Sequence, residues 1–207
     1  MTSGTSKSDV SSFTPGPELV SYTRLRKQTS SEEVKPKSVR FLTFVSQTIA
    51  FETGGDKSGA YTNNPNDRGG ETKWGLSKRS HPHLNIKAIT YGQAVELYKA
   101  EYWNDMYDFI LSDSLAFKLF DMGVLNGKRT AVKILQKTIK KMGTLIRVDG
   151  IFGPMTLTAT NNLNQDLLYE NYISAFDTRF RRLAVRIQKN KVFLRGWLIR
   201  LNWKWSI

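Results

Sequence analysis

The sequence predicts a mainly α-helical domain with a small β or loop lobe, preceded by an extended arm. Three observations lead to this prediction. Apolar residues recur at helical spacing through most of residues 39–207, a polar stretch rich in Gly and Asn interrupts them at 53–70, and residues 1–38 contain fourteen Ser or Thr and three Pro. The hydrophobic content of 40% is that of a globular protein, so the chain has enough apolar material for one good-sized core.

Residues 1–38 have the composition of a flexible, Ser/Thr-rich arm rather than of a folded unit. A few large side chains are candidates for anchoring this arm to a partner: Phe13, Leu19, Val20, Tyr22 and Leu25. Packing of the arm on its own domain stays open as the alternative. No apolar stretch reaches the roughly 18 residues that span a bilayer, and the N-terminus lacks the order of a signal peptide. We therefore expect neither membrane insertion nor an export signal.

The first helix is predicted to begin at Val39. Leu42, Val45 and Ile49 recur at helical spacing, and Glu52 continues the same stripe. This pattern places a carboxylate on the buried face of the helix, at its C-terminal end.

The later elements follow from turn residues, helix caps and apolar spacing. The stretch 53–70 suits a loop or a small β-hairpin, because its Gly and Asn residues favour turns. Thr90 and Gln93 have the spacing of a capping box, which predicts a helix that runs to about Trp103. Four further helices are predicted at about 114–126, 130–142, 154–163 and 166–188.

The net charge of +13 indicates an anionic partner: nucleic acid, a membrane surface or the acidic polymers of a bacterial wall. The charge is uneven, because no Asp or Glu follows Asp177 while the last thirty residues hold nine Lys or Arg. No nucleic-acid motif accompanies the charge, so we do not expect nucleic acid as the partner. The absence of cysteine excludes disulfides and thiolate sites. His81 and His83 are expected to be solvated loop residues.

Glu52 has the surroundings that a catalytic acid needs. Cleaving a glycosidic bond requires a carboxylic acid that protonates the leaving oxygen, and a group that positions a nucleophile or a water. At the end of an apolar stripe, desolvation favours the neutral carboxylic acid, and the negative end of the helix dipole acts in the same direction. Without further context, a Glu at a helix end is usually a solvated cap.

Motifs after this glutamate make the chemistry more specific. In order they are Glu-x-Gly-Gly from Glu52, Asp-x-Gly-Gly-x-Thr-x-x-Gly from Asp67, Tyr-Trp at 102–103, and Phe-Asp-Met-Gly-Val-Leu-Asn-Gly at 120–127. The series resembles glycoside hydrolase family 108, the phage and bacterial N-acetylmuramidases. Residues 148–157 resemble the small C-terminal peptidoglycan-binding segment that accompanies this domain, and Arg-Gly-Trp at 195–197 is similar to the family's closing pattern. The resemblance covers about residues 39–201.

The resemblance implies a lysozyme-like fold with a catalytic domain at 39–128, whose cleft lies beside the β or loop lobe. A helical, peptidoglycan-binding-like segment at 129–207 would pack on it. It further implies a glycoside hydrolase that cleaves the β-1,4 bond between N-acetylmuramic acid and N-acetylglucosamine, with Glu52 as the catalytic acid. Phage-type lysozymes with a Glu, Asp, Thr series hold the attacking water with the Asp and Thr. Their counterparts here are Asp67 and Thr72, and the reaction would then be inverting.

Two of these assignments have structural alternatives. Asp67 is also suited to bracing the glycine turn, and Thr72 to capping a helix that begins near Trp74. The sequence also departs from the family pattern, because residues 56–60 intervene where the family commonly places an aromatic residue. This insertion adds Asp56 as a lesser candidate for the second carboxylate.

Candidate substrate contacts are three aromatic residues and one amide: Trp74, Tyr102, Trp103 and Asn126. The rings would stack on sugars and the amide would bind an acetamido group, while core packing and a helix C-cap are the structural alternatives. Asp121 is expected to be a structural hydrogen-bonding residue. The C-terminal basic run, with tryptophans at 197, 203 and 205, suits an anionic wall polymer or a partner subunit, or else forms a solvated basic face.

The predicted function is that of a phage lysozyme that acts on peptidoglycan glycan strands of the host wall during entry or lysis. The alternatives are a lytic transglycosylase and a catalytically silent, wall-binding structural subunit of the virion. No metal or cofactor is expected, since acid-assisted glycoside hydrolysis needs neither. The arm favours a place in the phage tail or baseplate, contacting other subunits. The alternative location is the host cytoplasm late in infection, with release by a holin.

Overall fold

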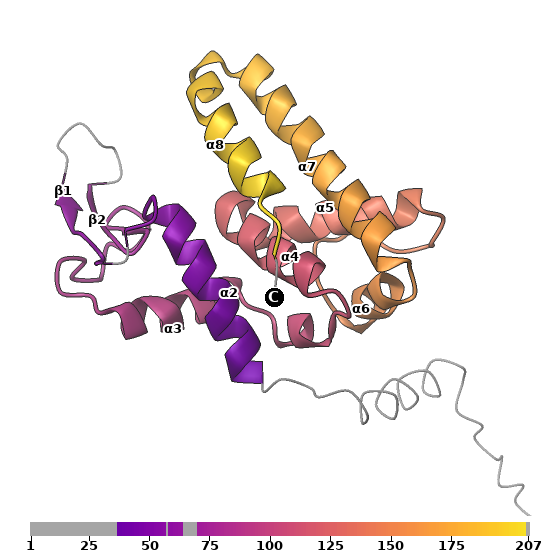
Figure 1. The fold of residues 1–207 in the computed structure, drawn as a ribbon, viewed down its shortest axis with the longest axis horizontal. Coiled ribbons are helices and arrows are strands. Elements are labelled where there is room, and N and C mark those ends of the chain that lie inside the picture. Colours follow the sequence, from indigo (N-terminus) through magenta and orange to yellow (C-terminus); the bar gives the residue numbers. More distant parts are fainter. Residues whose placement is uncertain (1–36, 57, 64–69, 206–207) are drawn as a thin grey trace, which may run out of the picture. The chain divides into compact units, whose positions relative to one another are not determined.

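The computed structural model describes residues 37–56, 58–63 and 70–205 (Figure 1). Within these ranges the chain forms seven α-helices and a three-stranded antiparallel sheet, which confirms the predicted fold class. The helices are α2 (Lys37–Glu52), α3 (Tyr91–Tyr102), α4 (Asp113–Asn126), α5 (Lys128–Lys141), α6 (Pro154–Asn161), α7 (Gln165–Arg186) and α8 (Lys191–Asn202), with 3-10 turns η1 (Asp105–Phe109) and η2 (Gln188–Asn190). The strands are β1 (Thr62–Asn63), β2 (Glu71–Lys73) and β3 (Leu76–Ser77). The predicted arm lies outside the described residues, except for its last two positions, which begin α2.

Local sequence explains where the helices begin. The Thr90 side chain accepts a hydrogen bond from the Gln93 backbone amide, and the Gln93 side-chain oxygen accepts one from the Thr90 backbone N–H, so the predicted capping box is confirmed. The side chains of Ser112 and Asn164 each accept a hydrogen bond from a backbone amide in the first turn of α4 and α7, and Pro154 stands in the first turn of α6. The five helices predicted after the lobe are therefore present, within about two residues. The helix α8 was not predicted.

The buried face of α2 is rotated from the predicted one. Leu42 is 51% exposed, so its place in the predicted stripe was wrong. The buried apolar side chains are Phe41, Phe44, Val45 and Ile49, and they place the stripe one residue earlier in the first turns of the helix. Glu52 stays on the edge of this face because it lies three residues after Ile49.

The small lobe is a meander in the order β1-β2-β3. Thr72 lies in the central strand, opposite Thr62 on one side and Ser77 on the other. Trp74 and Gly75 link β2 to β3 with positive φ angles of 54° and 78°, as in a two-residue hairpin turn. The alternative in which Thr72 caps a helix near Trp74 is therefore wrong, because this stretch forms a hairpin.

One hydrophobic core contains side chains from the first described helix, α2, and from the last, α8. The central helix is α4, which is buried from Leu115 to Gly123. Trp203 and Trp205, which follow α8, pack their rings within 5.2 Å of Phe117 on α4. Trp203 and Trp205, which lie in the C-terminal basic run, therefore pack against the hydrophobic core. No helix in the described ranges is both long and apolar enough to cross a membrane.

Lys118 is fully buried in α4 and supports the C-terminal end of α8. Its ammonium group donates hydrogen bonds to the carbonyl oxygens of Arg200 at 2.9 Å and Trp203 at 3.1 Å. Carbonyls at a helix C-terminus lack helical partners, so the lysine satisfies them. Burial lowers the pKa of Lys118 to about 8, although the charge of Asp121 opposes this shift.

We expect Lys118 to make the free energy of unfolding rise with pH above 8. Between its folded pKa of about 8 and its ordinary value of 10.5, the unfolded chain binds more protons at this site than the folded chain does. Urea denaturation of the wild type and Lys118→Met at pH 7 and 9.5 checks this, because other groups titrate alike in both proteins. The wild type should gain about 2 kcal/mol relative to the variant over this interval. A pH-independent difference would contradict the buried, titrating lysine.

Candidate active site

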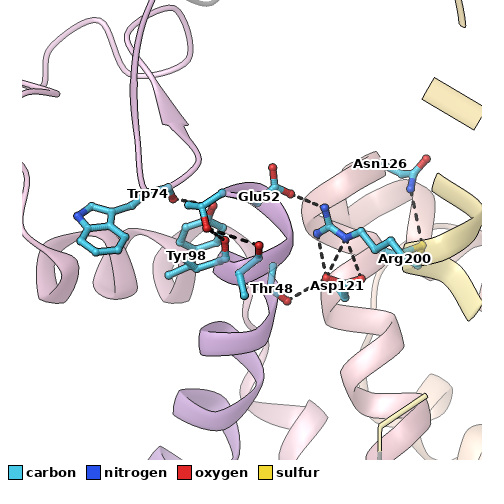
Figure 2. A network of polar contacts seen from close by, with 11 residues as sticks. Thr48, Glu52, Trp74, Tyr98, Asp121, Asn126 and Arg200 are labelled. Atoms are coloured by element: carbon cyan, nitrogen blue, oxygen red, sulfur yellow. Dashed lines mark hydrogen bonds and ion pairs between the residues drawn. The ribbon is translucent and has the colours of Figure 1, made fainter. Parts of the chain in front are cut away.

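Glu52 is the last residue of α2, and its side chain is 25% exposed. The carboxyl group points away from the helix toward Arg200 (Figure 2). The predicted position, a partly buried carboxyl group at the C-terminal end of a helix, is confirmed. A carboxyl group in this position can contact a substrate and a buried neighbour at the same time.

Arg200 of α8 joins Glu52 to a second carboxylate. Its Nη1 donates to Glu52 Oε1 at 2.6 Å, and its Nη2 donates to Asp121 Oδ1 at 2.8 Å. Its Nε lies 3.1 Å from Asp121 Oδ2. Asp121 is fully buried on α4 and also accepts a hydrogen bond from Thr48 of α2 at 2.9 Å. The expected structural role of Asp121 is thus confirmed, and the network fastens α2, α4 and α8 together (Figure 2).

Arg200 stays charged in this setting. Burial by itself would lower the pKa of Arg200, but the charge and hydrogen bonds of Asp121, and then of Glu52, outweigh it and raise the pKa. With Asp121 ionised, the triad carries one net negative charge when Glu52 is ionised, and none when Glu52 holds a proton. The sequence pattern predicts desolvation and the helix dipole at Glu52, but it gives no sign that this cation lies beside Glu52.

The hairpin turn between β2 and β3 forms a wall beside Glu52. A Cβ atom added to Gly75 would lie 2.6 Å from the Glu52 Cβ and 2.5 Å from the Tyr98 hydroxyl oxygen. Tyr98 of α3 donates its hydroxyl to the Trp74 carbonyl at 3.2 Å, and burial raises the pKa of Tyr98, which keeps this donor protonated. The glycine lets the turn approach the carboxyl-bearing residue, and the tyrosine holds the turn there.

Replacing Gly75 with Ala should displace the turn or Glu52 and lower hydrolysis by roughly a hundredfold, since small misplacements of reacting groups are costly. The φ of 78° adds a backbone penalty of about 1–2 kcal/mol to folding. Rates on purified cell walls and urea denaturation measure both effects. Gly92→Ala is the matched control, because a Cβ at Gly92 meets nothing within 4 Å. Equal activity of the Gly75→Ala protein and this control would contradict the close approach.

The candidates for the water-holding group are placed as follows. Asp67 lies outside the described residues. Thr72 is partly buried in β2, and its hydroxyl donates to the Gly70 carbonyl at 3.4 Å. Asp56 accepts hydrogen bonds from Ser58 at 2.7 and 2.8 Å and from the Ala60 amide at 3.0 Å. These bonds lower the pKa of Asp56, and they engage both of its carboxyl oxygens in bracing its own loop.

The candidate aromatic contacts differ in their access to ligand. The Trp103 ring is 6% exposed and packs in the core against Phe41, its centroid 5.2 Å away. The Trp74 ring is also buried, 5.1 Å from the Tyr91 ring, and Figure 2 shows it directed away from Glu52. Both rings therefore have packing roles. Tyr102 is only partly buried, so it keeps a surface for ligand.

Asn126 and the two histidines complete the predicted set. Asn126 is the last residue of α4, partly buried, with its amide 4.0 Å from the Met122 sulfur, and the C-cap itself is Gly127. His83 is exposed as expected. His81 is buried and lies 2.8 Å from a Glu101 oxygen, so the expectation that it is solvated was wrong. Among the described residues no group of three or more His, Cys, Asp or Glu is arranged to hold a metal ion.

The sequence signal for Arg200 was present but hidden. Leu194, Leu198 and Leu201 recur at helical spacing in the stretch that forms α8. Five Lys or Arg among the residues from 189 to 204 make this stripe inconspicuous, because they give the segment the composition of a basic surface run.

Comparison with known proteins supports the resemblance. Residues 48–127 match the family described as "Glycosyl hydrolase 108", and residues 130–202 match the one described as "Predicted Peptidoglycan domain". Among solved structures, the chain is similar to SagA from Brucella abortus, with 24% identity over 77% of this chain and 89% of that one, at a TM-score of 0.59. At this identity the likeness shows the fold alone. A search of curated proteins finds no match. The chain therefore carries a glycosyl hydrolase 108 domain, which is followed by a predicted peptidoglycan domain.

Proposed function

We propose that the protein hydrolyses the β-1,4 bond between N-acetylmuramic acid and N-acetylglucosamine in peptidoglycan, with Glu52 as the general acid. The observation that carries this proposal is the position of Glu52. It is a partly exposed carboxyl group at a helix end, inside the segment that matches the hydrolase family, and it is held by a buried arginine. The peptidoglycan domain that follows supports the wall as the substrate.

In the proposed reaction the Glu52 proton passes to the glycosidic oxygen as the bond between this oxygen and C1 of N-acetylmuramic acid breaks. Water adds to C1 and releases a proton. The new Glu52 carboxylate remains paired with Arg200, which lies 2.6 Å away and stays charged. Arg200 therefore stabilises the form of Glu52 that proton donation produces, as preorganised charges do in other active sites.

Asp67 and Thr72 are the proposed holders of the attacking water, which would make the reaction inverting. Thr72 lies two residues before the Trp74–Gly75 turn that packs against Glu52, and this proximity in the hairpin supports its assignment. Tyr102 and Asn126 are the proposed sugar contacts, since both keep partly exposed side chains.

Digestion of purified peptidoglycan by the full chain tests the bond and the reaction type. The products are reduced with borohydride and identified by mass spectrometry. Reduced N-acetylmuramic acid at the new ends supports the proposal, and reduced N-acetylglucosamine would assign a different bond. Anhydromuramyl ends would identify a lytic transglycosylase instead. The absence of any product would favour a wall-binding subunit without activity.

We also propose that the enzyme serves a phage, either in the tail or baseplate during entry or in the host at lysis. The resemblance to a family that includes phage muramidases supports this context. Mass spectrometry of purified particles tests the virion location. Peptides of this chain in the particles support it, and their absence overturns it.

A further inference from the structure

The α7–α8 hairpin ends in an apolar surface that no described part of the chain covers. We define the hairpin tip as residues 181–195, which comprise the end of α7, η2 and the start of α8 (Figure 1). Its apolar side chains stand in solvent: Val185 is 78% exposed, Val192 77%, Phe193 55% and Ile187 38%. Exposed apolar side chains that gather at one place commonly mark an interaction site.

The same tip is strongly basic. Five exposed cationic residues lie among the apolar ones: Arg181, Arg182, Arg186, Lys191 and Arg195. No Asp or Glu follows Asp177 in the sequence, and Asp177 itself pairs with Arg181. The tip therefore attracts an anionic partner.

A shallow groove continues the tip along α8. Its apolar lining comes from Leu194, Leu198 and Ile199, and Lys191 and Arg195 line it as well. The mixture of cationic and apolar side chains therefore continues along α8 beyond the hairpin turn.

This combination selects one class of partner. A second copy of the chain is disfavoured, because each copy carries a net charge of +13 and this surface holds much of the basic excess. A soluble polyanion would use the cations but would leave the valines and the phenylalanine in water. An anionic phospholipid surface uses both, because its phosphates meet Lys and Arg while aliphatic and aromatic side chains enter the boundary between headgroups and acyl chains.

We propose that the hairpin tip binds the surface of an anionic phospholipid bilayer without crossing it. The tip is set apart from the candidate active site, since Phe193 precedes Arg200 by seven residues, or about 10 Å of helix. Binding therefore leaves Glu52 free to meet a glycan strand, and a wall hydrolase would be held beside the membrane that underlies its substrate.

Vesicle sedimentation with the full chain tests this proposal. The protein should bind vesicles of equal parts phosphatidylglycerol and phosphatidylcholine, and should remain in solution with phosphatidylcholine alone. Val185→Ser/Val192→Ser removes exposed apolar groups without changing charge, and should weaken binding at least tenfold. The matched control is Leu111→Ser/Leu145→Ser, which changes two exposed leucines away from the tip and should bind like the wild type. Thermal unfolding and wall hydrolysis in solution confirm that both variants are folded.

The proposal is overturned if the wild type fails to bind the mixed vesicles, and also by any of three further outcomes. Equal binding by the valine variant and the wild type would mean that charge alone drives binding. Binding to pure phosphatidylcholine would mean that the anionic lipid is not recognised. Complete displacement from vesicles by polyglycerol phosphate, with the same affinity for this polymer in the valine variant, would identify a soluble wall polyanion as the partner instead.

Discussion

Replacing Glu52 with Gln should lower the rate of peptidoglycan hydrolysis by about a hundred- to ten-thousandfold while leaving the fold in place. Glutamine has nearly the same shape as glutamate but has no acidic proton to give to the leaving oxygen, and general acids contribute rate factors of this size. The amide oxygen can still accept the hydrogen bond from Arg200, so the helix contacts should survive. The measurement is the initial rate of turbidity loss of purified cell walls, with circular dichroism to verify the fold.

Glu96→Gln is the matched control for this variant. Glu96 lies on α3 with an exposed side chain, so its replacement changes net charge by the same amount without touching the site. We expect wild-type rates from the control. A Glu52→Gln protein as active as this control would remove Glu52 from the mechanism.

Replacing Arg200 with Gln should both destabilise the protein and suppress hydrolysis. The change leaves Asp121 as a fully buried carboxylate without its cation, and breaking a buried pair in this way costs about 3–5 kcal/mol of unfolding free energy. It also removes the charge that stabilises Glu52 after proton donation. Urea denaturation and wall hydrolysis measured below the unfolding transition separate the two effects.

Two further proteins make the Arg200 prediction specific. Asp121→Asn combined with Arg200→Gln should recover part of the lost stability, because no buried charge remains unpaired, but should not recover activity. Arg147→Gln changes an exposed arginine and should behave like the wild type. A stable and active Arg200→Gln protein would contradict the role given to the triad.

Much of the helical framework follows from local sequence. Capping residues such as Thr90 and Ser112 act on their own helix, so their effects are visible without the fold. The error at Leu42 has a physical cause as well. Spacing alone allows two neighbouring stripes in a short helix, and only the core decides which is buried, here the one that contains Phe41 and Phe44.

The surroundings of Glu52 follow from the sequence only in part. The motif identifies Glu52, but its contact with Arg200 joins residues 148 positions apart, a separation that no local pattern encodes. The requirement for Gly75 also depends on the fold, because it arises where the turn meets Glu52 and Tyr98. For Trp103, burial in the core could not be told apart from ligand stacking, since both favour an aromatic ring beside a helix.

The most direct test of Glu52 as the general acid compares two leaving groups. A peptidoglycan tetrasaccharide is offered once with its natural sugar at the scissile bond, and once with a dinitrophenyl group that departs without a proton. Because the second reaction needs no acid, the ratio of wild-type to Glu52→Gln rates should be at least tenfold smaller for the dinitrophenyl substrate than for the natural one. Equal ratios on both substrates would contradict proton donation by Glu52.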